Sequence, residues 1–221
     1  MILSCDVGTH VVAPRRFFEH QRAVSDLACV ELLAPAVIID ITPRVRFLRD
    51  DNNNNNDAGR GDGEDAAADQ SAAVTVDDIT AWEQRNGRIP DGALVCMRSG
   101  WSRYFSEAPD KYLNKHPATG RMRFPHFSLE AATFLVRHRR FVGLGVDTLS
   151  PDAGDSDEFP VHGVVLGAGK YHVENMVLDG LPEAGFSFVT APLRIEGAYE
   201  APCRCVALSF VLHAGESAND E

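Results

Sequence analysis

The chain has 221 residues, of which 44% are hydrophobic, and a formal net charge of −11. This length and composition suit one domain with a full core and exclude a wholly disordered chain. No stretch approaches 18 consecutive apolar residues, and the N-terminus lacks a basic region followed by an apolar one, so we expect neither a transmembrane helix nor a secretory signal.

The negative charge lies mostly in two segments, residues 50–78 with a net −8 and residues 215–221 with −3. The rest of the chain is about neutral and lacks the basic excess of a nucleic-acid-binding surface. The five cysteines show no disulfide-scaffold pattern, which predicts reduced thiols. We therefore expect a cytoplasmic protein with neither a nucleic-acid nor a membrane partner.

The first notable feature along the chain is the turn Gly8-Thr9-His10. Glycine allows the backbone to bend sharply, so the flanking side chains can converge. Asp6 and His10 are four residues apart and could reach one cation across such a turn. The spacing alone, however, is more typical of structural residues than of a metal site.

The next segments predict a strand, an insertion and a helix. Residues 36–41 form a short, apolar, β-branched run, which indicates a buried strand. Residues 49–76 are acidic and rich in Asn and Asp, which predicts a flexible insertion within a single domain that spans residues 1–214. Asp77 or Asp78 is expected to cap a helix that runs to about Asn86.

The second half of the chain alternates between strand and helix patterns. Ser128 is a good N-cap for a helix whose apolar face would carry Leu129, Ala132, Phe134 and Leu135. Residues 163–169 are ambiguous, and residues 215–221 are expected to be a disordered tail. Strands are expected at residues 92–98, 141–149, 171–175, 186–195 and 203–212, the last of which would close the sheet. The pattern predicts an α+β (or α/β) fold.

Several side chains with metal-binding or acid–base chemistry lie in this half. His162 follows Pro160 and Val161, a position equally typical of a histidine bonded to a helix start. His172 and Glu174 alternate along a predicted strand, so both face a pocket or both face solvent.

Asp147 ends a predicted strand, where an acid either forms a turn or contributes to a site. Cys203 and Cys205 share one face of the last strand. A single Cys-x-Cys is more typical of core packing than of a soft-metal site.

Longer stretches carry a more specific signal. They are GTH, SGW (residues 99–101), FPHFSLEAATFL, GLGVDTLSPD, FPVHGVVLGAG, VENMVLDGLP and APLRIEGAYEAPCRCVAL. In this order and spacing the chain resembles the cyclase family of metal-dependent hydrolases, which includes the bacterial-type kynurenine formamidases. The resemblance implies a swivelling β/β/α domain with a mixed, barrel-like sheet and flanking helices, assembled as a homodimer or homotetramer. It also implies hydrolysis of a small amide with one or two divalent ions, commonly zinc or manganese.

The family signature His-x-Gly-Thr-His-x-Asp-x-Pro-x-His is only partly kept. Its first histidine falls on Asp6, its second on His10 and its proline on Pro14. Val12 replaces the aspartate, and Arg16 replaces the last histidine, which is the proton-transfer group of the family.

Downstream, the ligand histidine and the ligand glutamate of the family match His162 and Glu174. The resemblance therefore implies four ligands, namely these two together with Asp6 and His10. Two imidazoles and two carboxylates suit one zinc or manganese ion. A bridged pair of ions would lack the acidic ligand that Val12 replaces.

The first functional hypothesis is a metal-dependent amide hydrolase of the arylformamidase type. Arg16 stays protonated and cannot accept a proton, so His172 or His20 would carry it.

Trp101, Phe17 and Phe18 would line an apolar pocket or, equally, pack in the core. The second hypothesis is a non-catalytic relative that serves as a binding or assembly protein. In that case Arg16 would bind a carboxylate ligand, or pair with Asp6 and fill the metal position with its guanidinium.

Overall fold

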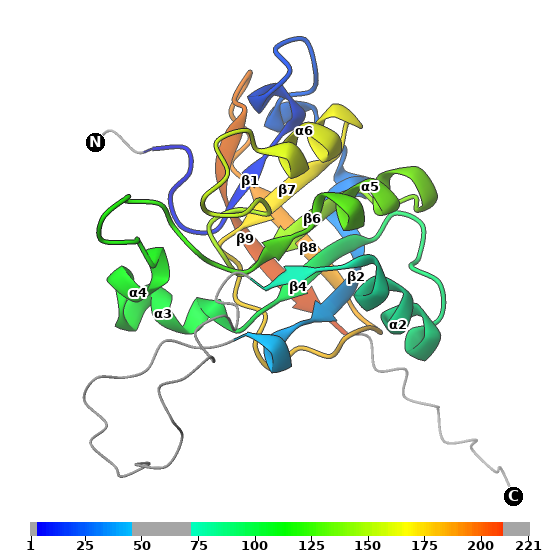
Figure 1. Ribbon diagram of the computed structural model, residues 1–221. Coiled ribbons are helices and arrows are strands. Elements are labelled where there is room, and N and C mark those ends of the chain that lie inside the picture. The colour runs from blue at the N-terminus through cyan, green and yellow to red at the C-terminus, as the bar shows by residue number, and fades with distance from the viewer. Residues whose placement is uncertain (1–3, 46–71, 210–221) are drawn as a thin grey trace, which may run out of the picture.

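The computed structural model describes residues 4–45 and 72–209, and these are built around a closed barrel of seven strands (Figure 1). Most of the expected insertion and the whole expected tail lie outside the described residues. The barrel strands, in spatial order, are β1 (His10–Val12), β7 (Tyr171–Glu174), β6 (Gly143–Val146), β4 (Leu94–Arg98), β2 (Leu33–Asp40), β8 (Ser187–Pro192) and β9 (Glu200–Leu208).

Strand direction divides the barrel into two parts. Neighbours are parallel from β7 through β6 and β4 to β2, whereas β8, β9 and β1 pair antiparallel with their neighbours. β1 pairs with both β7 and β9 and so closes the barrel. A separate two-stranded sheet joins β3 (Ala73–Val74) and β5 (His126–Phe127).

Helices cover the parallel strands on their outer face (Figure 1). The α-helices are α1 (Cys29–Leu32), α2 (Val76–Asn86), α3 (Tyr104–Glu107), α4 (Pro109–Leu113), α5 (Leu129–His138) and α6 (Pro160–Gly167). Short 3₁₀ turns are η1 (Pro14–Arg16), η2 (Val24–Asp26), η3 (Thr42–Arg44) and η5 (Trp101–Arg103). None of the helices within the described ranges has the length and apolar character needed to cross a membrane.

Alternate residues of the parallel strands pack into two different cores. In β2, Ala36 and Ile38 face the barrel interior, and Val37 and Ile39 face the helices. Burial on both faces explains why residues 36–41 are almost continuously apolar. Gly145 of β6 faces the interior, where a Cβ atom would lie 2.5 Å from the sulfur of Cys96, so only glycine fits there.

The expected fold class and all the expected strands of residues 36 onward are confirmed, with shorter or shifted bounds. The ambiguous segment is helix α6, and the last strand closes the sheet as expected, through β8 and β1. The end of the expected insertion is ordered instead, because Ala73 and Val74 form β3.

Two helix details differ from expectation. Thr75, rather than Asp77 or Asp78, caps α2: its hydroxyl accepts from the Asp78 N–H, and the Asp78 carboxylate accepts from the Thr75 N–H at 2.8 Å. Ser128 caps α5 as expected, but Leu129 is 40% exposed. The buried residues of α5 are instead Ala131, Ala132 and Leu135, and Phe134 is partly buried against the same core.

Candidate active site

The pairing of β1 with β7 brings together two residues that lie far apart in the sequence. His10 stands directly opposite Glu174 in this antiparallel ladder, and Val12 stands opposite His172. The intervening Val11 and Val173 belong to the core inside the barrel. Since alternate residues of a strand face opposite sides, His10 and Glu174 face outward.

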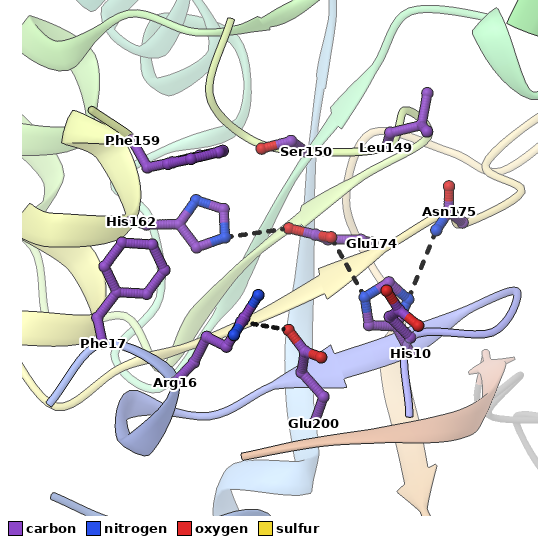
Figure 2. Close-up of a pocket in the computed structure, with 11 residues that line it drawn as sticks. His10, Arg16, Phe17, Leu149, Ser150, Phe159, His162, Glu174, Asn175 and Glu200 are labelled. Atoms are coloured by element: carbon purple, nitrogen blue, oxygen red, sulfur yellow. Dashed lines mark hydrogen bonds and ion pairs between the residues drawn. The ribbon is translucent and has the colours of Figure 1, made fainter. Parts of the chain in front are cut away.

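Helix α6 packs against β7 and against the η1 turn, and it carries His162 in its first turn (Figures 1 and 2). The Asp152 carboxylate accepts from the backbone N–H groups of Val161 (2.7 Å) and His162 (3.0 Å). It also contacts His162 Nδ1 at 2.6 Å. Asp152 therefore caps the helix and orients the imidazole with its Nε2 free to face β7.

Glu174 lies between two imidazoles (Figure 2). His10 Nε2 lies 3.3 Å from Glu174 Oε2, and His162 Nε2 lies 3.3 Å from Oε1. His10 Nδ1 is 2.9 Å from the carbonyl oxygen of Gly8, a group that can only accept, which places the proton on Nδ1. Glu174 is 6% exposed, and its Oε1 is a buried atom without a hydrogen-bond partner.

Burial and charge shift the pKa values of all three groups. Burial alone would lower the pKa of His162, but the Asp152 and Glu174 carboxylates raise it to about 9. Burial likewise opposes protonation of His10, and Glu174 reverses this and raises the pKa. Burial would raise the pKa of Glu174, but the close contacts of its two oxygens with the two imidazoles lower it below its ordinary value.

These groups open into a cavity of about 370 Å³. Its lining residues are Asp6, His10, Arg16, Phe17, Leu149, Ser150, Phe159, His162, Glu174, Asn175 and Glu200. The ring of Phe17 stacks on the imidazole of His162 with centroids 5.1 Å apart, and Phe159 meets the same imidazole edge-on at 5.8 Å. Carboxylates and two phenylalanine rings therefore line this cavity.

An ion pair stands beside the two imidazoles. Arg16 Nε lies 2.8 Å from Glu200 Oε1, and the Arg16 guanidinium lies over the ring of Tyr199. The guanidinium therefore pairs with Glu200 and not with Asp6, which is exposed and accepts from the Ser4 hydroxyl. The hydrogen bond from Ser4 lowers the pKa of Asp6.

The structure does not bring every expected site residue to the cavity. His172 is fully buried beneath His162, with ring centroids 4.7 Å apart, and neither of its ring nitrogens has a hydrogen-bond partner. Burial lowers its pKa well below the ordinary value, so this imidazole is neutral. His20 is exposed and does not line the cavity.

Of the three aromatic candidates, one lines the cavity and two do not. Phe17 lines the cavity, whereas Phe18 lies against Gly167 at the end of α6. Trp101 is fully buried in the helix-facing core, and its indole N–H donates to the carbonyl oxygen of Tyr112 at 3.0 Å.

Two acids of the site were not among the candidates from the sequence. Asp152 directly follows Pro151 in the SPD stretch after β6, where an acid gives only a weak signal. Glu200 begins β9, and the expected strand began three residues later. Cys203 and Cys205, 3.8 Å apart at sulfur, pack against the barrel core and away from this cavity.

Within residues 4–45 and 72–209, no three His, Cys, Asp or Glu side chains already form a group arranged to hold a metal ion. His10 and His162 approach opposite oxygens of Glu174, so the three side chains do not converge on a single point. A shared cation would require the Glu174 carboxylate to turn between its two partners.

Comparisons with known proteins agree with this fold. The family model described as "Putative cyclase" matches residues 1–153. The isatin hydrolase of Roseibium aggregatum is 28% identical over 217 residues, which cover 94% of this chain and 73% of that enzyme. The kynurenine formamidase of Salinibacter ruber is 26% identical over 92% of this chain and 76% of its own. The solved structure of isatin hydrolase A from Ralstonia solanacearum superposes with a TM-score of 0.76 at 32% identity, over 92% of this chain and 72% of that one.

Proposed function

Because the chain belongs to the cyclase family, we propose that it is a metal-dependent hydrolase of small aromatic or cyclic amides. The observation that carries this proposal is the environment of Glu174. A buried carboxylate with one unbonded oxygen faces two imidazole Nε2 atoms, and each imidazole has its Nδ1 already occupied. An Nδ1 partner of this kind fixes the ring orientation of a histidine whose Nε2 binds a metal.

The spacing and the charge of the site support a divalent ion. Two ligands about 2.1 Å from a tetrahedral ion lie about 3.4 Å apart, and both His–Glu174 contacts measure 3.3 Å. Three carboxylates line the cavity, from Asp6, Glu174 and Glu200, against the single guanidinium of Arg16. We therefore assign His10, His162 and Glu174 as the holding residues, with Asp6 on the open side.

When bound there, zinc or manganese supplies Lewis acidity that activates a water molecule and polarises a carbonyl oxygen. The chain itself positions the substrate. Phe17 and Phe159 present flat apolar surfaces beside His162, which suits a planar aromatic ring next to the amide. We do not assign proton transfer to His172 or His20, since neither lines the cavity.

The names of the relatives suggest the substrates to test first, namely isatin and N-formylkynurenine-like N-formyl aromatic amines. Cyclic imides and lactones complete the panel. We expect hydrolysis of at least one cyclic or formyl amide that stops after chelation and returns with zinc or manganese. Unchanged melting in chelator, together with no metal in the protein as purified, would instead support the non-catalytic alternative.

A further inference from the structure

Glu200 is the one carboxylate of the cavity wall that comes from β9 (Figure 2). In the β1–β9 ladder it stands directly opposite Val12, two positions along β1 from His10. Its side chain therefore faces the same side of the barrel as His10 and Glu174. Only 8% of Glu200 is exposed, an uncommon level for a carboxylate that serves solubility alone.

The ion-pair partner of this carboxylate is Arg16. The ion pair joins Arg16 Nε to Glu200 Oε1, and the Arg16 side chain is 47% exposed. The ion pair is made through Oε1, and Figure 2 shows the Glu200 carboxylate between Arg16 and His10. An exposed guanidinium can swing away at little cost, because its charge is readily solvated.

The charge around Glu200 favours a second positive partner. Its neighbours are two further carboxylates, Asp6 and Glu174, and the positive groups Arg16 and His10. When the two imidazoles bind a metal in their neutral form, Arg16 is the single positive side chain that faces the three carboxylates of this cavity. A divalent cation in contact with both Glu174 and Glu200 would restore the balance.

We propose that Glu200 is an additional carboxylate ligand of the divalent ion, and that Arg16 is the counter-ion that holds it when no metal is bound. This inference rests on the proposed function, because it adds a ligand to the same site. Val12 offers no oxygen on β1, and the carboxylate comes from the adjacent strand β9 instead.

Two variants that break the same ion pair separate this role from a structural one. Glu200→Gln removes the carboxylate and Arg16→Gln removes only its counter-ion. The measurement is the Kd for Mn²⁺ by isothermal titration calorimetry, with the EPR signal of bound Mn²⁺ as a second readout, on the chelator-treated full chain. We expect Glu200→Gln to weaken binding at least tenfold and Arg16→Gln to leave it unchanged or tighten it.

The outcomes are distinguishable. Equal weakening by both variants, or an unchanged Kd in Glu200→Gln, overturns the role of Glu200 and leaves the proposed function standing. No Mn²⁺ or Zn²⁺ binding by the unmodified chain overturns the proposed function itself. If Glu200→Gln misfolds because Arg16 loses its partner, the double variant Arg16→Gln/Glu200→Gln removes both charges, and it is expected to show the same weakening.

Discussion

Two buried acids stand at corresponding ends of neighbouring parallel strands, and their surroundings differ. Asp147 directly follows β6 and is fully buried; it accepts from Ser99 N (2.9 Å), Ser99 Oγ (2.5 Å) and Gly100 N (2.7 Å). Glu174 ends β7 and faces two imidazoles, with one oxygen lacking a hydrogen bond. Both acids stand at the end of a strand. Their surroundings differ because a loop supplies hydrogen-bond donors to Asp147, whereas β1 and helix α6 supply imidazoles to Glu174.

The contrast separates an acid enclosed by hydrogen-bond donors from an acid that lines a cavity. Neutral donors surround Asp147, and burial raises its pKa to about 6. The imidazoles beside Glu174 lower its pKa despite its burial. A carboxylate whose oxygens are already occupied by backbone and hydroxyl donors holds a loop in place. A carboxylate that faces ligand-type nitrogens and opens into a cavity is available for a cation.

The largest effect is expected from Glu174→Gln. An amide of the same shape keeps the packing, but it removes the charge that a divalent ion needs between the two imidazoles. We expect the Kd for Zn²⁺ or Mn²⁺ to rise by about 100-fold or more, as is typical when a ligand is lost. Calorimetric titration measures this, and the metal-free melting temperature should change by only a few degrees. A variant that binds metal as tightly as the unmodified chain would remove Glu174 from the ligand set.

Asp147→Asn is the matched substitution at the structural acid. The amide NH₂ would face the N–H donors of Ser99 and Gly100, so at least one hydrogen bond is replaced by a donor–donor contact. We expect a loss of about 2–3 kcal/mol in the free energy of unfolding. Urea denaturation of the metal-free protein measures it. Metal affinity should change less than about twofold, and a larger change would show that the two acids are coupled.

The fold was largely predictable because its signals are local. Residues 36–41 are an apolar β-branched run that is buried on both faces, and this pattern is visible without the structure. Ser128 before an amphipathic stretch predicts α5 in the same way. The sequence predicts a turn at Gly8-Thr9-His10 but no strand β1, because three residues carry almost no periodicity. Only its pairing with β7 and β9 makes it a strand.

Only the site residues that lie within family-like stretches of sequence could be predicted. His10, His162 and Glu174 stand in stretches that resemble the family, and the barrel brings them together. Asp152 and Glu200 depend on tertiary structure, since one reaches α6 from a loop and the other reaches the cavity across a strand pair. Their sequence neighbours give no periodic signal for either contact. His172 shares the face of Glu174, as alternation predicts, but α6 covers it.

The pH dependence of the metal-free protein gives the smallest change for each step in the measurement, and it sharpens the contrast between the acids. Asp152 and Glu174 raise the pKa of His162 from its ordinary 6.5 to about 9. A raised pKa in the folded state gives stability that is fully present below pH 6.5 and is lost as the pH rises through about 9.

We expect the metal-free protein to lose up to about 1.4 kcal/mol per pH unit across this range, as one proton permits. Metal affinity should rise over the same range, because protons and the cation compete for His162 Nε2. Urea denaturation at a series of pH values in chelator, and Mn²⁺ titration at the same pH values, measure the two trends.

Asp147→Asn should keep both slopes, since Asp147 titrates near pH 6, below this range. Glu174→Gln should flatten the stability slope, because it removes one of the two charges that raise the pKa of His162. A flat stability profile in the unmodified protein would show that Glu174 and His162 do not form a charged pair, and the distinction between the two acids would then rest on hydrogen bonding alone.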